Sequence, residues 1–123
     1  MQYGTGSVPL VDGLLAAVRF VEGLGLERIE RWDAALTRRL RDGLGRLPAA
    51  RLSSPADPRL GAAITTFRVE GVGAKALQDA LWARRVRVRA QGDANGVRLS
   101  AHLYMSPADI DTVLDVAGSL RSS

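Results

Sequence analysis

The chain has 123 residues, of which 46% are hydrophobic and 24% charged, so it can fold as one domain around one modest core. It has no cysteine, which excludes disulfide frameworks, thiol nucleophiles and cysteine-based zinc sites in this sequence. No apolar run approaches the roughly 18 residues of a membrane span and no secretory leader is visible, so we expect a cytoplasmic protein with no membrane partner.

The net charge of +4 comes from 16 arginines and Lys75, set against 13 acidic residues. The arginines are spread along the chain among the acids, and aromatic residues make up 5% of the sequence. A face that binds nucleic acid needs clustered basic residues with aromatic side chains between them. We therefore expect no nucleic-acid partner.

The first half of the chain predicts two helices after a short loop over residues 1–7. Apolar residues recur at helical spacing over 8–22, where Ser7 can cap the helix and Pro9 is tolerated in the first turn. A second, amphipathic helix is expected over 26–44, because an apolar stripe there is opposed by a charged side. The stripe consists of Ile29, Trp32, Ala35, Leu36, Leu40 and Leu44.

The second half predicts short strands that alternate with helices. Residues 63–69 are rich in β-branched and aromatic side chains, and Asn95-Gly96 is a hairpin signal between two alternating stretches. Ser106 followed by Pro107 is typical of a helix start. The expected strands are an edge strand over 51–53 and strands over 63–69, 86–90 and 97–101. The expected helices cover 74–84 and the stretch from 107, and the second of these frays by 121.

This order predicts an α+β fold, with a small antiparallel sheet of three to four strands, helices packed on one face and a long helix in front. We expect a single domain over residues 1–123. Within it, residues 1–25 form a Gly-Thr loop and a leading helix, and residues 26–123 form a small α+β domain.

The residues alone supply no catalytic set and no metal site. Ser100 and His102 share a face of an expected strand, but no elbow motif marks Ser100 as a nucleophile. Gly4-Thr5-Gly6 before a helix suits an anion, although such a segment is more often only a cap. His102 is either a ligand contact or a packed residue, and composition favours packing.

Three stretches nevertheless resemble the C-terminal, small domain of class V aminotransferase-family enzymes, which are fold type I pyridoxal-phosphate enzymes. That family includes selenocysteine lyases, cysteine desulfurases and isopenicillin N epimerase-like proteins. The third stretch is the most specific, and the resemblance covers nearly the whole chain. The stretches are Tyr3–Gly6, Leu15–Ile29, and Val97–Tyr104 followed by Ser106, Asp109, Ile110 and Asp111.

The resemblance implies roles for three residues. Thr5 matches a threonine that reaches the cofactor phosphate of a partner subunit, which implies a homodimer. Arg98 matches the arginine that holds the α-carboxylate of the substrate, a pairing that a guanidinium makes through two parallel hydrogen bonds. The alternative is that Arg98 is an exposed strand arginine like Arg87 and Arg89. His102 lies where this branch often has a histidine, so it is a candidate substrate-binding residue.

The chain also departs from the family pattern. The lysine that forms the Schiff base lies upstream in the family, and Lys75 in an expected surface helix matches no catalytic position. Met105 stands where the family phrase usually has asparagine. The loop that carries a cysteine in desulfurases would fall near 91–95, where the loop is short and has no cysteine. This argues against a mechanism in which a cysteine abstracts sulfur.

The sequence therefore predicts the C-terminal domain of a pyridoxal-phosphate-dependent enzyme that acts on an amino acid or amine as an aminotransferase, lyase or epimerase. The isolated chain is expected to be inactive and to bind no pyridoxal phosphate stably. Its expected partner is the missing large domain or a homologous subunit. The alternative is a stand-alone, non-enzymatic module for interaction or for binding a small acid, with apolar surface left exposed on its first helix.

Overall fold

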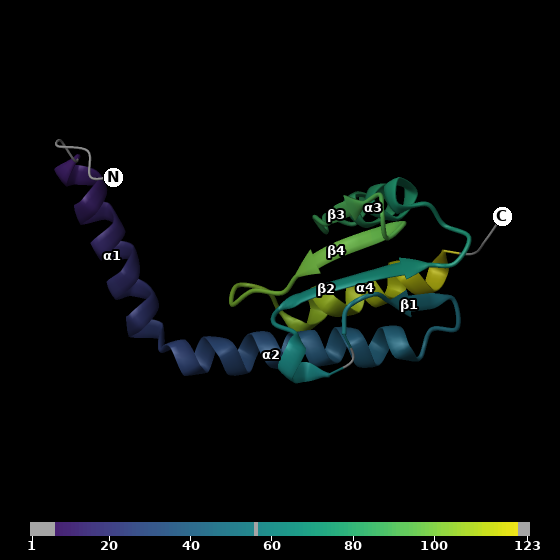
Figure 1. The fold of residues 1–123 in the computed structure, drawn as a ribbon, viewed down its shortest axis with the longest axis horizontal. Helices are drawn as coiled ribbons and strands as arrows, with labels where there is room; N and C mark the ends of the chain where they lie inside the picture. The colour runs from purple at the N-terminus through teal and green to yellow at the C-terminus, as the bar shows by residue number, and fades with distance from the viewer. Residues whose placement is uncertain (1–6, 56, 121–123) are drawn as a thin grey trace. The chain divides into compact units, whose positions relative to one another are not determined.

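The structure is a computed structural model that describes residues 7–55 and 57–120. It has four α-helices, a 3-10 turn and a four-stranded sheet within these residues (Figure 1). The predicted α+β class is therefore confirmed. In chain order the elements are α1 Val8–Leu24, α2 Leu26–Gly45, β1 Ala50–Leu52, η1 Pro58–Leu60, β2 Ile64–Val69, α3 Ala74–Ala83, β3 Arg89–Gln91, β4 Gly96–Ser100 and α4 Pro107–Ser119.

Two compact units make up the chain, Met1–Arg31 and Trp32–Ser123. In the first unit, α1 has a proline in its first turn and ends at Gly25, whose φ of 87° lies in the left-handed region that favours glycine. No described residue of α1 is buried. The most exposed large apolar side chains of α1 are Val8, Leu10, Val11, Leu14 and Phe20. No helix within the described ranges is long and apolar enough to cross a membrane.

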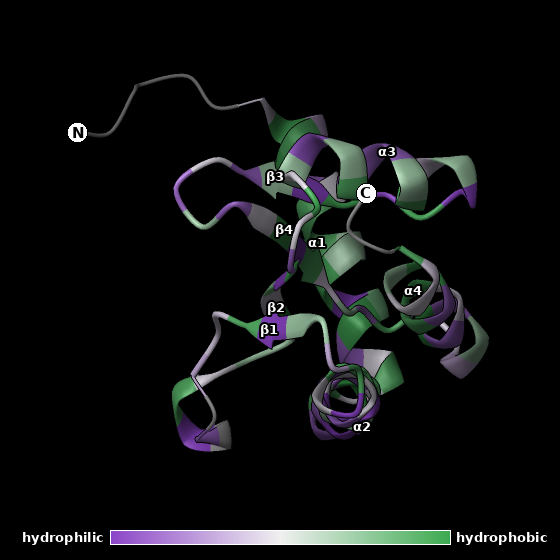
Figure 2. Cartoon of the chain, turned by 90° about the vertical axis from the view of Figure 1, so that its right-hand side faces the viewer, coloured by the Kyte–Doolittle hydropathy of each residue, from purple (hydrophilic) through white to green (hydrophobic). Residues whose placement is uncertain are grey.

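The second unit is built on an antiparallel sheet in the order β1-β2-β4-β3. Side chains alternate along β2, where Thr65, Phe67 and Val69 are buried and Arg68 is exposed. The helices α2, α3 and α4 lie along one side of the strands (Figure 2). The sheet therefore has one face in the core and one open face, as the alternation predicts.

The core lies between the sheet and these helices. Phe67 is fully buried at its centre, and α2 contributes Leu36, Leu40 and Leu44. The predicted stripe of α2 is correct from Leu36 onward, while Trp32 is 41% exposed. The remaining core residues come from the strands, from the residues directly before β3 and after β4, and from α3 and α4: Ala50, Val69, Leu77, Leu81, Val88, Val97, Leu99, Ala101, Ile110, Val113, Val116 and Ala117.

The predicted strand over 86–90 is wrong in its position, since β3 begins at Arg89. The chain leaves α3 through Arg85 at φ 63°, and the Gln78 amide nitrogen then donates to the backbone oxygen of Val88 at 2.9 Å. The Val88 carbonyl is thus bonded to a side chain of α3, and residues 86–88 are not part of the sheet. The 3-10 turn η1 was also not expected from the sequence.

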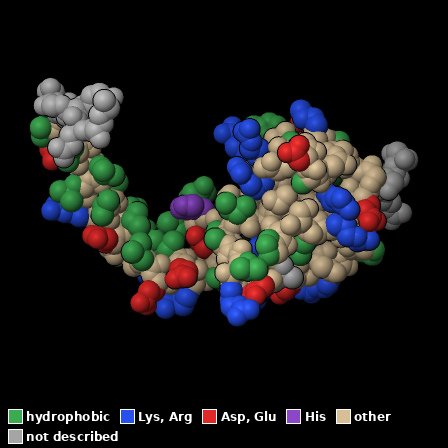
Figure 3. Space-filling model, viewed as in Figure 1, with side chains coloured by type: hydrophobic (Ala, Val, Ile, Leu, Met, Phe, Trp, Pro, Cys, Tyr) green, Lys and Arg blue, Asp and Glu red, His purple; other side chains and the backbone are tan. Residues whose placement is uncertain are grey.

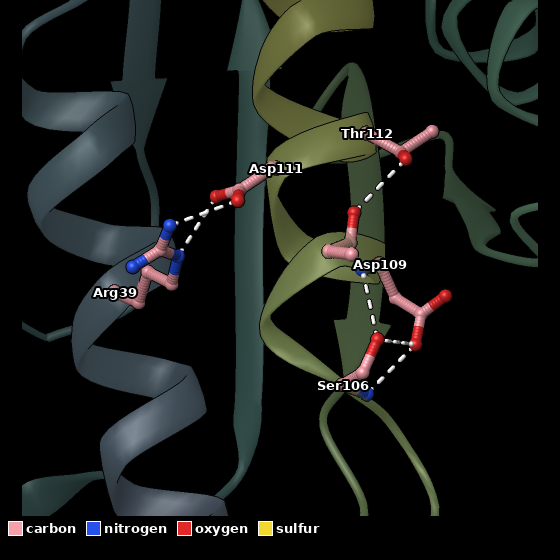
Figure 4. Close-up of polar contacts among 6 residues, drawn as sticks. Arg39, Ser106, Asp109, Asp111 and Thr112 are labelled. Carbon is pink, nitrogen blue, oxygen red and sulfur yellow. Dashed lines mark hydrogen bonds and ion pairs between the residues drawn. The ribbon is translucent and has the colours of Figure 1, made fainter.

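The start of α4 follows the prediction closely. Ser106 is the N-cap and forms a capping box with Asp109, whose carboxylate accepts hydrogen bonds from the Ser106 backbone N–H at 2.7 Å and hydroxyl at 2.8 Å (Figure 4). One turn further, the Arg39 guanidinium of α2 donates to both carboxylate oxygens of Asp111 at 2.7 and 2.8 Å. These contacts fix the direction in which the preceding loop enters the helix.

Candidate functional site

Arg98 lies in the middle of β4 on the open face of the sheet. Its neighbours Val97 and Leu99 are buried, so the strand alternation turns Arg98 away from the core. Directly opposite it are Thr66 on β2 and Arg89 on β3. Arg98 is exposed and has no ion pair with any residue that the structure describes. Its guanidinium is thus available to a ligand.

An open pocket of about 640 Å³ lies beside Arg98. Residues 86–88 line it and precede the pairing of β3 with β4, which starts at Arg89. Its volume is within the range of small-molecule sites in proteins. The lining comes from α3, the approach to β3, β4 and the following loop: Gln78, Asp79, Trp82, Val86, Arg87, Val88, Arg89, Arg98, Ser100 and Tyr104.

The pocket is positively charged. Arg87 lies 5.3 Å over the ring of Trp82, a cation–π contact that orders the guanidinium beside the pocket. The acid in the lining, Asp79, is ion-paired with Lys75 one helical turn away. Figure 3 shows Lys and Arg side chains gathered near β3 on the face turned to the viewer. The arrangement favours an anionic ligand.

The loop after β4 supplies an aromatic pair. The rings of His102 and Tyr104 are stacked with centroids 4.7 Å apart, and Tyr104 is 79% exposed and lines the pocket. The loop is fixed by two hydrogen bonds at Met105, whose N–H donates to His102 O at 2.8 Å and whose oxygen accepts from Trp32 Nε1 at 3.1 Å. His102 is exposed, so the preference for a packed histidine is wrong.

The acids near this loop have structural rather than chemical roles. The Ser106 backbone N–H, and secondarily its hydroxyl, lower the pKa of Asp109. The hydrogen bonds from Arg39 lower the pKa of Asp111 in the same direction. Both carboxylates are therefore held in the charged form by their partners and are not proton donors near neutral pH.

Of the other candidate residues, Ser100 and Lys75 are described by the structure and Thr5 is not. Ser100 ends β4 and lines the pocket, and His102 stacks on Tyr104, which is also a lining residue. Thr5, the candidate phosphate ligand, lies outside the described residues. Lys75 is exposed on α3 and paired with Asp79.

Reasoning from the sequence missed Trp82 and treated Arg87 as an exposed strand residue. Both line the pocket next to Arg98. Alternation of apolar residues with arginine over 86–90 was a signal for Arg87, whereas nothing local to α3 marks Trp82. Among the described residues there is no cluster of three potential metal ligands.

Comparison with known proteins gives consistent matches. The model of the family "Aminotransferase class-V" matches residues 1–113. A probable cysteine desulfurase of Synechocystis sp. is 32% identical over 123 residues, which cover 98% of this chain and 26% of that protein. A probable cysteine desulfurase of Pyrococcus abyssi is 27% identical over 135 residues, which cover 98% of this chain and 33% of that protein.

The solved structures agree. The apo structure of cysteine desulfurase from Thermococcus onnurineus NA1 superposes with a TM-score of 0.84 at 30% identity, covering 95% of this chain and 32% of that one. The chain thus spans about a quarter to a third of the length of the relatives that it matches.

Proposed function

The chain belongs to the class-V aminotransferase family of pyridoxal-phosphate-dependent, fold type I enzymes, and we propose that it is the C-terminal part of such an enzyme acting on an amino acid or amine. Its relatives are described as cysteine desulfurases and are about three to four times longer than the matched region. In this proposal the chain is the part of a cytoplasmic enzyme that binds the substrate's α-carboxylate. The reaction is that of an aminotransferase, lyase or epimerase.

The observation that carries the proposal is the position of Arg98. Its guanidinium lies on the open face of β4 without an acidic partner among the described residues, at the edge of a pocket large enough for an amino acid. A guanidinium binds a carboxylate through two parallel hydrogen bonds and so fixes its orientation as well as its position. Arg98 would therefore orient the substrate rather than take part in proton transfer.

Two further residues have supporting roles in the proposal. His102, stacked on Tyr104, would form an aromatic wall against which the substrate lies. Thr5 would donate its hydroxyl to the cofactor phosphate of a partner subunit, as a hydroxyl before a helix can do.

The described residues do not fit the cofactor itself. A Schiff base needs a lysine amine within reach of the substrate, and the amine of Lys75 is occupied by Asp79 on the exposed side of α3. No step of the cofactor chemistry is therefore assigned to this chain. The β3–β4 loop is short and the sequence has no cysteine, so we also propose that the reaction does not pass through a persulfide on this segment.

The exposed apolar residues of α1 support a second candidate function, that of a stand-alone interaction module. Large apolar side chains such as Leu10 and Leu14 are 75% and 65% exposed, which is typical of a surface that packs against a partner. In the enzyme, that partner would be the large domain or a homologous subunit of a homodimer. Light scattering measures whether the chain associates with itself through α1. A clean monomer at high concentration would contradict self-association.

A ligand titration tests the main proposal. L-Alanine is added to the ¹⁵N-labelled chain, and we expect NMR shifts centred on Arg98 and Ser100 that Arg98→Gln abolishes. Arg68→Gln is the matched control, because Arg68 is an exposed arginine on the same face but does not line the pocket. Equal responses in the wild type and Arg98→Gln would overturn the carboxylate role. Turnover by the chain with added pyridoxal phosphate and amino acid would contradict the expected inactivity.

A further inference from the structure

Two arginines face each other across the hairpin at the pocket. Arg89 and Arg98 are directly opposite in the antiparallel pairing of β3 and β4, and both are exposed on the open face. Side chains in such positions start about 5 Å apart, and like charges there repel each other. Neither has an ion pair with a residue in the described part of the chain. The pair is more favourable when an anion lies between the two guanidinium groups.

Arg87 adds a third guanidinium to the same pocket. It lies over the ring of Trp82, which holds it next to Arg89 and Arg98 rather than leaving it free in solvent. The negative charge of Asp79 is already paired with Lys75, so it does not compensate the arginines. One bound carboxylate would therefore leave two of three arginines without a counter-charge.

We propose that Arg87 and Arg89 form a second anion-binding position beside Arg98, and that the substrate of this site is an amino acid whose side chain ends in an acid group. The inference rests on the proposed function, in which Arg98 takes the α-carboxylate. The side-chain acid then lies between Arg89 and Arg87, and the pocket of about 640 Å³ has room for both groups.

The test compares L-glutamate with L-glutamine, which has nearly the same shape but a neutral side chain. Both are titrated into the full chain, and binding is followed by the NMR signals of β4 and of the Trp82 indole. We expect glutamate to bind about tenfold more tightly, the effect of one charge-assisted hydrogen bond at an exposed site. Arg87→Gln and Arg89→Gln are each expected to reduce this preference, while Arg68→Gln leaves it unchanged.

The variants separate failure of the inference from failure of the proposed function. Arg98→Gln should weaken the binding of both amino acids, and unchanged binding of both would overturn the carboxylate site itself. Equal affinity for glutamate and glutamine, with a normal loss in Arg98→Gln, would overturn only the second position. Inorganic phosphate is a further probe: if it binds as tightly as glutamate, the arginines form a general anion site and the assignment to an acidic side chain is wrong. Thermal unfolding of each variant verifies that it is folded.

Discussion

Removing the hydroxyl of Ser106 tests whether the capping box holds the start of α4. In the structure, this hydroxyl donates to the Asp109 carboxylate at 2.8 Å and accepts a long hydrogen bond from the Asp109 N–H at 3.4 Å. The Ser106 N–H also donates to the same carboxylate at 2.7 Å. Ser106→Ala removes the first two hydrogen bonds and leaves the third.

The expected loss of unfolding free energy is about 1 kcal/mol, the middle of the range of about 0.5–2 kcal/mol for an N-cap serine. The surviving backbone bond at 2.7 Å keeps the loss from the upper end of that range. In a domain of this size, about 1 kcal/mol lowers Tm by roughly 4–8 °C. The loop that carries His102 and Tyr104 enters α4 at this cap, so the same change is expected to loosen the pocket wall.

The effect depends on pH in a definite direction. The Ser106 backbone N–H and then its hydroxyl lower the pKa of Asp109 in the folded state. A depressed carboxyl pKa contributes stability that is present above the unfolded pKa of about 3.9 and is lost as the pH falls through the folded value. The difference between wild type and Ser106→Ala should therefore be complete at neutral pH and shrink below about pH 4.

Urea unfolding at several pH values measures the free energy of unfolding and its pH dependence. Tryptophan fluorescence reports on it because Trp32 and Trp82 lie in the second unit. Ser119→Ala is the matched control, since it removes a serine hydroxyl at the other end of α4 where it only donates to Val116 O. The control should change stability by no more than about 0.5 kcal/mol. The reasoning is refuted if both variants lose equal stability at neutral pH, or if the loss in Ser106→Ala persists undiminished in acid.

Two further changes test other contacts. A Cβ added at Gly96 would lie 2.3 Å from the Phe67 backbone oxygen, so Gly96→Ala should cost about 1–3 kcal/mol in urea unfolding, whereas Gly92→Ala has open space and should cost far less. Arg39→Gln should raise the pKa of Asp111 toward its ordinary value, because the Arg39 guanidinium lowers it. A ¹³C NMR titration measures this pKa in both proteins. The same Asp111 pKa in the wild type and the variant would contradict the ion pair. The stability that this pair adds is present above the unfolded carboxyl pKa and is lost as the pH falls.

Elements marked by local signals could be predicted from the sequence. Ser106 followed by Pro107 predicted a helix start, and α4 begins there, with a capping box between Ser106 and Asp109. The β-branched and aromatic residues over 63–69 correctly predicted a strand, which the structure has as β2. In contrast, β3 begins only at Arg89, directly after the Val88 oxygen that accepts a hydrogen bond from Gln78. That bond joins residues ten positions apart and has no local signature in the sequence.

The pocket residues also differ in whether the sequence could predict them. The family resemblance singled out Arg98, and the alternation over 97–101 predicted only a half-exposed strand around it. Trp82 could not, because it belongs to α3 and meets the arginines only after α3 packs beside β3 and β4. Asn95 shows how such packing is fixed: its side-chain oxygen accepts from the Ala74 N–H at 3.2 Å and so ties the hairpin loop to the start of α3.

The hairpin register explains why two arginines lie opposite each other. Had Asn95-Gly96 formed a two-residue turn, the pairing would place Asp93 opposite Arg98, which would add an ion pair of about 0.2–1 kcal/mol. The chain instead turns through four residues, with Gln91 opposite Gly96 and Arg89 opposite Arg98.

The observed register is favoured by what it buries. In the observed register Val88 enters the core and is only 7% exposed. In the register of a two-residue turn, the residues of 90–94 on the core side would be Ala90, Gly92 and Ala94, which bury little apolar surface. Burial of one valine contributes about 1.5–3 kcal/mol, more than the cross-strand ion pair would. The apolar core therefore decides the register, and the same register leaves the guanidinium of Arg98 free for a ligand instead of paired with Asp93.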